Sequence, residues 1–164
     1  MPPALFLMNK KMELTKGQKI GMRQVFSADG MRFPVTEIVV EKPIFQPGEL
    51  VDVSGKTRGL GFAGVVKRHH FAGGPRTHGQ SDRERAPGSI GSTTTPGRVL
   101  KGKRMAGKAG GKKVTVKNLL VVQTDSENKK ILVKGAIPGK PKSSLLIKKT
   151  GKKTNFTSQL VTEA

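Results

Sequence analysis

The feature that most limits the fold of this chain is its middle segment, residues 55–113. This segment holds 14 Lys or Arg residues, 2 acidic residues and 14 of the chain's 21 glycines. So polar and glycine-rich a stretch cannot offset the entropy of its own ordering, and a structureless loop of this length is unusual inside a compact domain. We therefore predict that the segment becomes ordered on another molecule, with its cations paired to phosphate and its glycines allowing close backbone approach.

The charge of the whole chain indicates what that other molecule is. The 164 residues contain 31 Lys and Arg against 11 Asp and Glu, a formal charge of +20, and such a density destabilises a compact state unless a polyanion neutralises it. An anionic membrane is the alternative to nucleic acid, but the apolar runs are about strand length, well short of the roughly 20 residues that span a bilayer. Nucleic acid is therefore favoured. The sequence also has no cysteine, which excludes disulfides and thiolate metal sites.

The segments on either side of the middle are predicted to be β structure. Short runs rich in β-branched residues alternate with turn signals such as SADG and SENK. No run has an apolar period of 3.6 residues, so little helix is expected. Such a series favours a small barrel or an open sheet. The expected strands are 19–26, 32–40, 46–55, 113–125, 130–139 and 143–149.

Two nucleotide-binding motifs occur at the start of the middle segment. GLGFAG at 59–64 matches the G-x-G-x-x-G fingerprint of dinucleotide enzymes, and GKT at 55–57 matches the end of a phosphate loop. The fingerprint requires a strand that runs directly into the glycines and a helix that follows them. Here SGKTR separates the strand from the first glycine, and no helix is expected in VVKRHHFAGG. A phosphate loop would need its first glycine at Leu50. Both interpretations are disfavoured.

The three histidines raise the question of a metal or catalytic site. His69, His70 and His78 are numerous enough for zinc, but adjacent histidines rarely bind one ion and their neighbours here are cations. Ser81, His78 and Asp82 have the residue types of a catalytic triad without the local pattern of a nucleophile elbow. We therefore expect no catalytic residue, no metal and no cofactor, and the chain is predicted not to be an enzyme.

The predicted RNA-contacting residues are the cations, the histidines and one aromatic residue of the middle segment. Because aromatics are scarce there, the contacts should be mainly to phosphate, sugar and RNA shape. The cations are expected to neutralise phosphates, whereas the histidines and Phe71 are expected to stack or to donate hydrogen bonds. The set consists of Lys56, Arg58, Lys67, Arg68, His69, His70, Phe71, Arg76, His78, Arg83, Arg85, Arg98, Lys101, Lys103, Arg104 and Lys108.

Taken together, the motifs of this chain resemble those of the bacterial type of large-subunit ribosomal protein three. The signature of that family runs from an aromatic residue through an acid into a glycine-rich run that ends on arginine. It is present here as Phe45, Asp52, Gly55, Thr57, Gly59, Gly61, Gly64 and Arg68. The resemblance continues through THGQS, RAPGSIG, TPGRVLKGKRMAG and ILVKGAIPG, and it spans most of residues 16–149.

The resemblance implies a mainly β fold, a small translation-protein-type β-barrel with a long extended basic arm. It divides the chain into an N-terminal tail (1–13), a first barrel part (14–55), the arm (56–112), a second barrel part (113–150) and a C-terminal tail (151–164). The family binds large-subunit rRNA early in assembly, beside neighbouring ribosomal proteins, and its arm reaches toward the peptidyl transferase centre. The resemblance thus implies a bacterial or bacterial-derived organellar ribosome, without a membrane or a small-molecule substrate.

Three departures from the family pattern have structural consequences. Leu60 stands where the family prefers a basic residue, so one phosphate contact is expected to be missing. Thr94 stands where many bacterial members carry a glutamine that is N-methylated, so this modification is expected to be absent. Between Glu41 and Phe45 typical members have many more residues. A closed small barrel and an incomplete, open sheet are both compatible with this gap, and a partner protein or rRNA is a further candidate to take the place of the missing segment.

The charge by itself is also compatible with a second function, a basic protein that packages DNA without sequence preference. Such a protein would bind polyanions through the same phosphate contacts. The two hypotheses differ in where the chain is found, because a ribosomal protein co-sediments with the large subunit and a packaging protein is recovered with DNA.

Overall fold

The computed structural model describes residues 14–27, 29–42, 45–154 and 160–161. The predicted N-terminal tail, 1–13, lies outside the described residues. The chain divides into two compact units, Gly59–Gly111 and the remainder on either side of it. We call them the inserted unit and the ring unit. Within the described ranges, no helix is long and apolar enough to cross a lipid bilayer.

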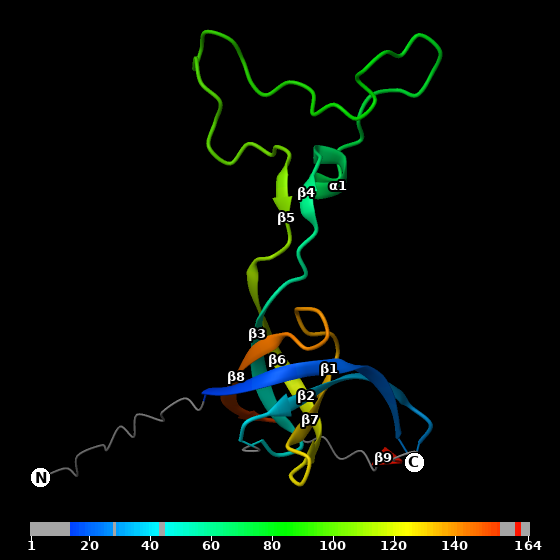
Figure 1. The fold of residues 1–164 in the computed structure, drawn as a ribbon, viewed down its shortest axis with the longest axis vertical. Helices are drawn as coiled ribbons and strands as arrows, with labels where there is room; N and C mark the ends of the chain where they lie inside the picture. Colours follow the sequence, from blue (N-terminus) through cyan, green and yellow to red (C-terminus); the bar gives the residue numbers. More distant parts are fainter. Residues whose placement is uncertain (1–13, 28, 43–44, 155–159, 162–164) are drawn as a thin grey trace, which may run out of the picture. The chain divides into compact units, whose positions relative to one another are not determined.

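The ring unit is made of antiparallel strands, which Figure 1 labels. Six of them pair in the order β2–β7–β6–β3–β8–β1, and β1 pairs again with β2, so the order closes on itself. A further strand, β9 (Leu160–Val161), pairs with β1. The open-sheet alternative is therefore not observed. The six strands are β1 (Leu14–Ser27), β2 (Arg32–Val40), β3 (Glu49–Lys56), β6 (Lys113–Asp125), β7 (Lys130–Lys134) and β8 (Ser144–Lys153).

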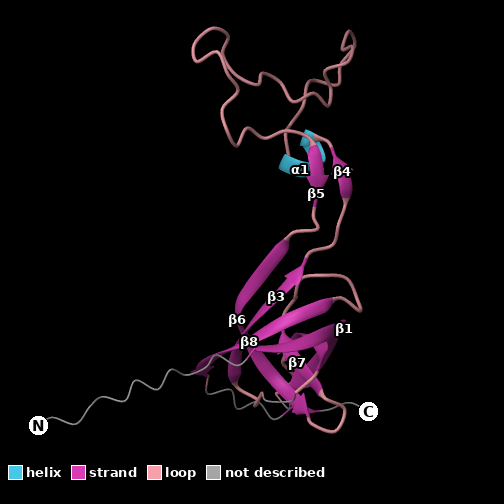
Figure 2. Cartoon of the chain, turned by 60° about the vertical axis from the view of Figure 1, so that its left-hand side comes forward, coloured by secondary structure: helices cyan, strands magenta, loops and turns pink. Residues whose placement is uncertain are grey.

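The prediction of a mainly β chain with little helix is confirmed, and Figure 2 shows strand in nearly all of the regular structure. The observed strands β2 and β6 begin and end at the residues predicted for them, 32–40 and 113–125. The prediction for β1 begins too late, because Leu14 and the residues after it become strand by pairing with β8. The prediction for β7 runs too far, because the strand ends before Gly135, which has a φ of 94° and turns the chain away.

The core of the ring unit follows from alternation along these strands. In β3 the side chains of Val51 and Val53 are fully buried, whereas those of Asp52 and Ser54 are half-buried. A period of two is what a strand with one buried face requires. Branched aliphatic residues thus form most of the core of the ring, in a sequence that contains no Trp and no Tyr. The main cluster is Ile38, Val40, Phe45, Val51, Val53, Val121, Ile131, Val133, Ile137, Leu145 and Ile147.

Lys19 of β1 attaches the loop that follows β7 to the ring. Its side chain is buried, and Nζ donates to the carbonyl oxygens of Ile137 at 2.9 Å and Gly139 at 3.1 Å. Its backbone also bonds to Ser143 and Lys142 of the same loop. A buried ammonium group is costly unless it is hydrogen-bonded. The lysine and the loop carbonyls therefore stabilise one another.

Glu49, the first residue of β3, is a buried acid with several partners. Its carboxylate accepts a hydrogen bond from the backbone N–H of Gln46 at 3.1 Å and lies 2.9 Å from Lys149 Nζ and 3.9 Å from Lys153 Nζ. Burial raises the pKa of this carboxyl group, but the hydrogen bonds and the two lysine charges outweigh burial and hold the pKa below its ordinary value. A lowered folded-state pKa stabilises the fold above the unfolded pKa. This stabilisation is lost as the pH falls through the folded pKa.

We predict that replacing Glu49 by glutamine lowers the free energy of unfolding by about 1 to 3 kcal/mol at pH 7, because Lys149 loses its charged partner. The difference from the wild type should begin to shrink as the pH falls below the ordinary carboxyl pKa, because the unfolded wild-type chain then takes up a proton that the folded chain does not. It should vanish once the pH is below the lowered pKa of the folded state, where the wild-type group is neutral as well. Urea denaturation followed by circular dichroism measures both effects. The exposed Glu127→Gln variant is the control, and an equal loss there would contradict the assignment.

Candidate nucleic-acid interface

GLGFAG forms the first strand of the inserted unit. β4 (Gly61–Ala63) pairs antiparallel with β5 (Gly107–Ala109), and the N–H of Leu60 extends this ladder with a 2.9 Å bond to the last residue of β5. Gly61 has a φ of 69°, a left-handed conformation that suits glycine. The side chain of Leu60 is 52% exposed and that of Phe62 is 76% exposed. The motif is thus half of a strand pair with outward apolar side chains.

A short helix follows this motif, so the expectation that none forms there is wrong. α1 (Val65–His69) begins after the extended Gly64 and has no side-chain N-cap. Its C-cap is His70, whose φ of 60° is left-handed and whose N–H donates to the carbonyl oxygen of Val66. Val65 is buried, and the last turn is basic, as the helix dipole favours. One turn of helix after an antiparallel strand is not the βαβ geometry of a dinucleotide site.

Two of the predicted RNA contacts join α1 to the chain ahead of β5. Arg68 Nη1 lies 2.7 Å from the carbonyl oxygen of Met105, and His69 Nε2 lies 3.0 Å from the same oxygen. A Cβ on Gly107 would lie 2.6 Å from Arg68 Nη1, so glycine leaves room for the guanidinium group. Arg68 keeps most of its N–H groups for other acceptors. His69 also packs on Phe71, with ring centroids 6.0 Å apart.

The segment Gly73–Arg85 closes on itself as a compact loop. The N–H of Gly74 donates to the carbonyl of Glu84 at 2.9 Å, and Arg76 Nε pairs with the Glu84 carboxylate at 2.7 Å. Gly73 has a φ of 77°, and a Cβ there would collide with the Glu84 carbonyl oxygen. The glycine is therefore required by the close approach of two backbones. One of the predicted phosphate ligands, Arg76, already has a partner within the loop.

The other predicted cations are exposed and form no ion pair within the described part of the chain. His70 and His78 are exposed as well. The structure thus brings Arg68, His69 and Phe71 together and leaves the remaining set distributed along the chain. These cations are Lys56, Arg58, Lys67, Arg83, Arg85, Arg98, Lys101, Lys103, Arg104 and Lys108.

The inserted unit buries little apolar surface. Ala63 and Val65 are its buried hydrophobic residues. Every residue of Gly59–Gly111 is described, so this is a property of the whole unit. Its large hydrophobic side chains are mostly exposed instead: Leu60, Phe62, Ile90, Val99, Leu100 and Met105.

Sequence reasoning missed two features of this unit. The Met105 carbonyl, which holds Arg68 and His69, has no side-chain signature because a backbone group is the acceptor. The acidic residues that alternate with arginines in 82–85 indicated that an ion pair could form there. Which arginine pairs with Glu84 depends on the loop closure, which the sequence does not show.

Comparison with known proteins identifies the relatives of this chain. A family model described as ribosomal protein L3 matches residues 31–131. The protein is similar to the large ribosomal subunit protein uL3 of Dehalococcoides mccartyi strain 195, with 67% identity over 108 residues, 66% of this chain and 53% of the relative. It is also similar to uL3 of Herpetosiphon aurantiacus, with 56% identity over 133 residues, 81% of this chain and 62% of the relative. The chain spans about half the length of the curated relatives it matches.

We predict that Gly73→Ala opens the Gly73–Arg85 loop, because the added Cβ meets the Glu84 carbonyl oxygen and the backbone is left-handed. A cost of about 1 to 2 kcal/mol would raise the open population about 5- to 30-fold. Trypsin cleavage after Arg83 should accelerate by a similar factor. Gly88→Ala is the control, since Gly88 has a φ of 75° but open space around its Cβ position. Equal acceleration in both variants would rule out the loop contact as the cause.

Proposed function

Because the chain belongs to the ribosomal protein L3 family, we propose that it is a structural constituent of the large ribosomal subunit that binds large-subunit rRNA. The family consists of structural components of the ribosome and not of enzymes, in agreement with the prediction from the sequence. The relatives are longer than this chain. The role of this chain is therefore argued from its own residues.

The observation that carries the proposal is the combination of charge and missing core in the inserted unit. Two buried hydrophobic residues cannot offset the entropy of ordering Gly59–Gly111. The same residues present exposed cations and exposed apolar side chains, which pair with phosphate and cover base or sugar surface. Folding coupled to RNA binding supplies the stabilisation that the unit lacks.

The architecture proposed from the family resemblance agrees with the two units. We interpret the closed ring as a translation-protein-type β-barrel and residues 56–112 as a basic arm that extends into rRNA near the peptidyl transferase centre. The ring supports this interpretation because it has its own aliphatic core. By this proposal the chain acts early in subunit assembly, beside neighbouring ribosomal proteins, in a bacterial ribosome or that of a bacterial-derived organelle.

Most of the proposed rRNA ligands have side-chain N–H donors that are not used within the described structure. Lys101, Lys103 and Arg104 lie in an exposed run without ion pairs in the described structure. Arg68 and Arg76 each use part of the guanidinium group within the unit, so they are proposed to contact phosphate with their remaining N–H groups. Leu60 is exposed at a position where a cation is expected in the family, which removes one charge from this surface.

We predict that binding to a large-subunit rRNA transcript depends steeply on salt. For the wild type, a plot of log K against log salt concentration should have a steep negative slope. In a variant with Arg98, Lys101 and Arg104 changed to glutamine, this slope should be shallower by about 2 to 3, because three phosphate contacts are removed. Filter binding at several salt concentrations measures the slope. The control variant changes Arg23, Arg32 and Lys134 to glutamine, three exposed cations of the ring unit. A wild-type affinity that does not change with salt concentration would contradict the proposal.

We further predict that replacing residues 66–104 by a short Gly-Ser linker leaves the ring unit folded, because the aliphatic cluster lies outside the deleted part. The shortened chain should be depleted from large-subunit fractions in a sucrose gradient, while its far-ultraviolet dichroism remains β-like. The full-length chain in the same lysate is the reference. Recovery of that chain with DNA instead of ribosomes would favour the packaging function, and undiminished incorporation of the shortened chain would contradict the role of the inserted unit.

A further inference from the structure

One side of the ring unit presents a polar face that the core does not use. Val53 of β3, Ile147 of β8 and Thr15 of β1 are buried and lie in register across their strands. The residues that alternate with them therefore point outward, on four strands that are neighbours in Figure 1. We call this surface the lysine face. It consists of Lys113, Thr115 and Lys117 of β6, Asp52, Ser54 and Lys56 of β3, Ser144, Leu146 and Lys148 of β8, and Leu14, Lys16 and Gln18 of β1.

Two lysines of this face lie directly opposite one another. Lys56 and Lys113 are cross-strand partners in the antiparallel β3–β6 pair, and both are exposed. Side chains in such positions have Cβ atoms about 4.5 to 5.5 Å apart, and like charges there are destabilising. The next pair along, Ser54 and Thr115, is joined by a hydroxyl hydrogen bond of 2.7 Å. The register is therefore held, and an anion between the two ammonium groups would relieve their repulsion.

The lysine face has a single carboxylate for its five lysines. Asp52 is the cross-strand partner of Lys148, but its oxygen accepts the Asn118 N–H at 2.9 Å. No ion pair joins an acid to a lysine of this face within the described residues. On another side of the ring the pattern is different, since Lys130 pairs with Glu37 at 3.1 Å. The lack of counter-charge is thus a local property of the face.

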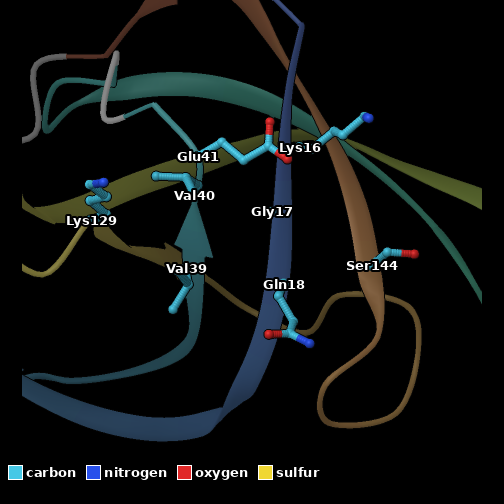
Figure 3. A pocket seen from close by; sticks show the side chains of 8 residues that line it. All are labelled: Lys16, Gly17, Gln18, Val39, Val40, Glu41, Lys129 and Ser144. Carbon is cyan, nitrogen blue, oxygen red and sulfur yellow. The ribbon is translucent and has the colours of Figure 1, made fainter.

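A shallow pocket of about 510 Å³ borders the lysine face at β1 and β8. Figure 3 shows that Lys16, Gln18 and Ser144 line it, together with Lys129 and Glu41. Ammonium, amide and hydroxyl groups are the side-chain donors that bond to phosphate and ribose. The Glu41 carboxylate lies on this border and limits the extent of the surface that a polyanion can cover.

We propose that the lysine face is a second phosphate-binding surface for rRNA, separate from the inserted unit. The inference rests on the proposed function. Each of the four strands contributes at least one lysine to the face: Lys56 and Lys113 are opposite one another on adjacent strands, and Lys117 lies four residues, about 13 Å, along β6 from Lys113. Lys148 and Lys16 are on the next two strands. This distribution suits a continuous phosphodiester backbone, and a face without aromatic side chains favours backbone contacts over base recognition. An acidic protein would be the other polyanion, and the experiment below separates the two.

The test compares two full-length variants that lose the same charge. The face variant changes Lys113, Lys117 and Lys148 to glutamine, and the control variant is the Arg23, Arg32 and Lys134 change used above. The face variant should lose about 2 to 3 from the magnitude of the salt slope with the large-subunit rRNA transcript, and the control should lose less than about 1. A face variant with the slope of the control would overturn the inference and point to an acidic protein partner.

Chemical labelling provides a second measurement on the unaltered chain, in case the face variant does not fold. Lys113, Lys117 and Lys148 should be acetylated several-fold more slowly when the transcript is bound, whereas Lys134 should react at an unchanged rate. Unprotected face lysines in a salt-sensitive complex would contradict the second surface while leaving the proposed function intact. Absence of salt-sensitive binding by the wild type would instead overturn the proposed function itself.

Discussion

The ring unit depends on β1, which has a strand neighbour on both sides. From Leu14 to Gln18 it pairs with β8, and from Gly17 to Phe26 it pairs with β2. Without both pairings the remaining strands would form an open sheet with exposed edges. Closure turns one face of the strands toward the aliphatic core and the other outward. It also places Lys19 against the loop after β7 and puts Lys16 of β1 on the strand next to Lys148 of β8.

The two units accommodate the high positive charge of the chain in different ways. The ring unit has a self-sufficient apolar cluster and places Glu37 and Glu49 against lysines. The inserted unit has almost no core, and its ion pair joins Arg76 to Glu84 at the surface, where such pairs contribute little. We infer that the stability of the inserted unit comes mainly from contacts with a binding partner. The apparent stability of the unit is therefore increased only while that partner is bound.

Local pattern accounts for much of the ring and little of the inserted unit. Arg32–Val40 could be predicted with its ends because half-buried strands alternate and turn signals flank them. The start of β1 could not be predicted, because Leu14 is strand through its pairing with distant Lys148. α1 could not be predicted, because a single helical turn is too short to show a 3.6-residue apolar repeat. Its support is tertiary, from the burial of Val65 and the carbonyl of Met105.

The same difference applies to the candidate site. The sign of the charge is a local property, so the cations of 55–113 could be identified from the sequence as candidate phosphate ligands. Whether a given cation has a partner depends on register and loop closure. Lys56 faces Lys113 only because β3 and β6 are neighbours in the ring, and Arg76 meets Glu84 only because Gly73 lets the loop turn back. Composition therefore predicts the class of partner, whereas the pairing pattern determines which cations are available to it.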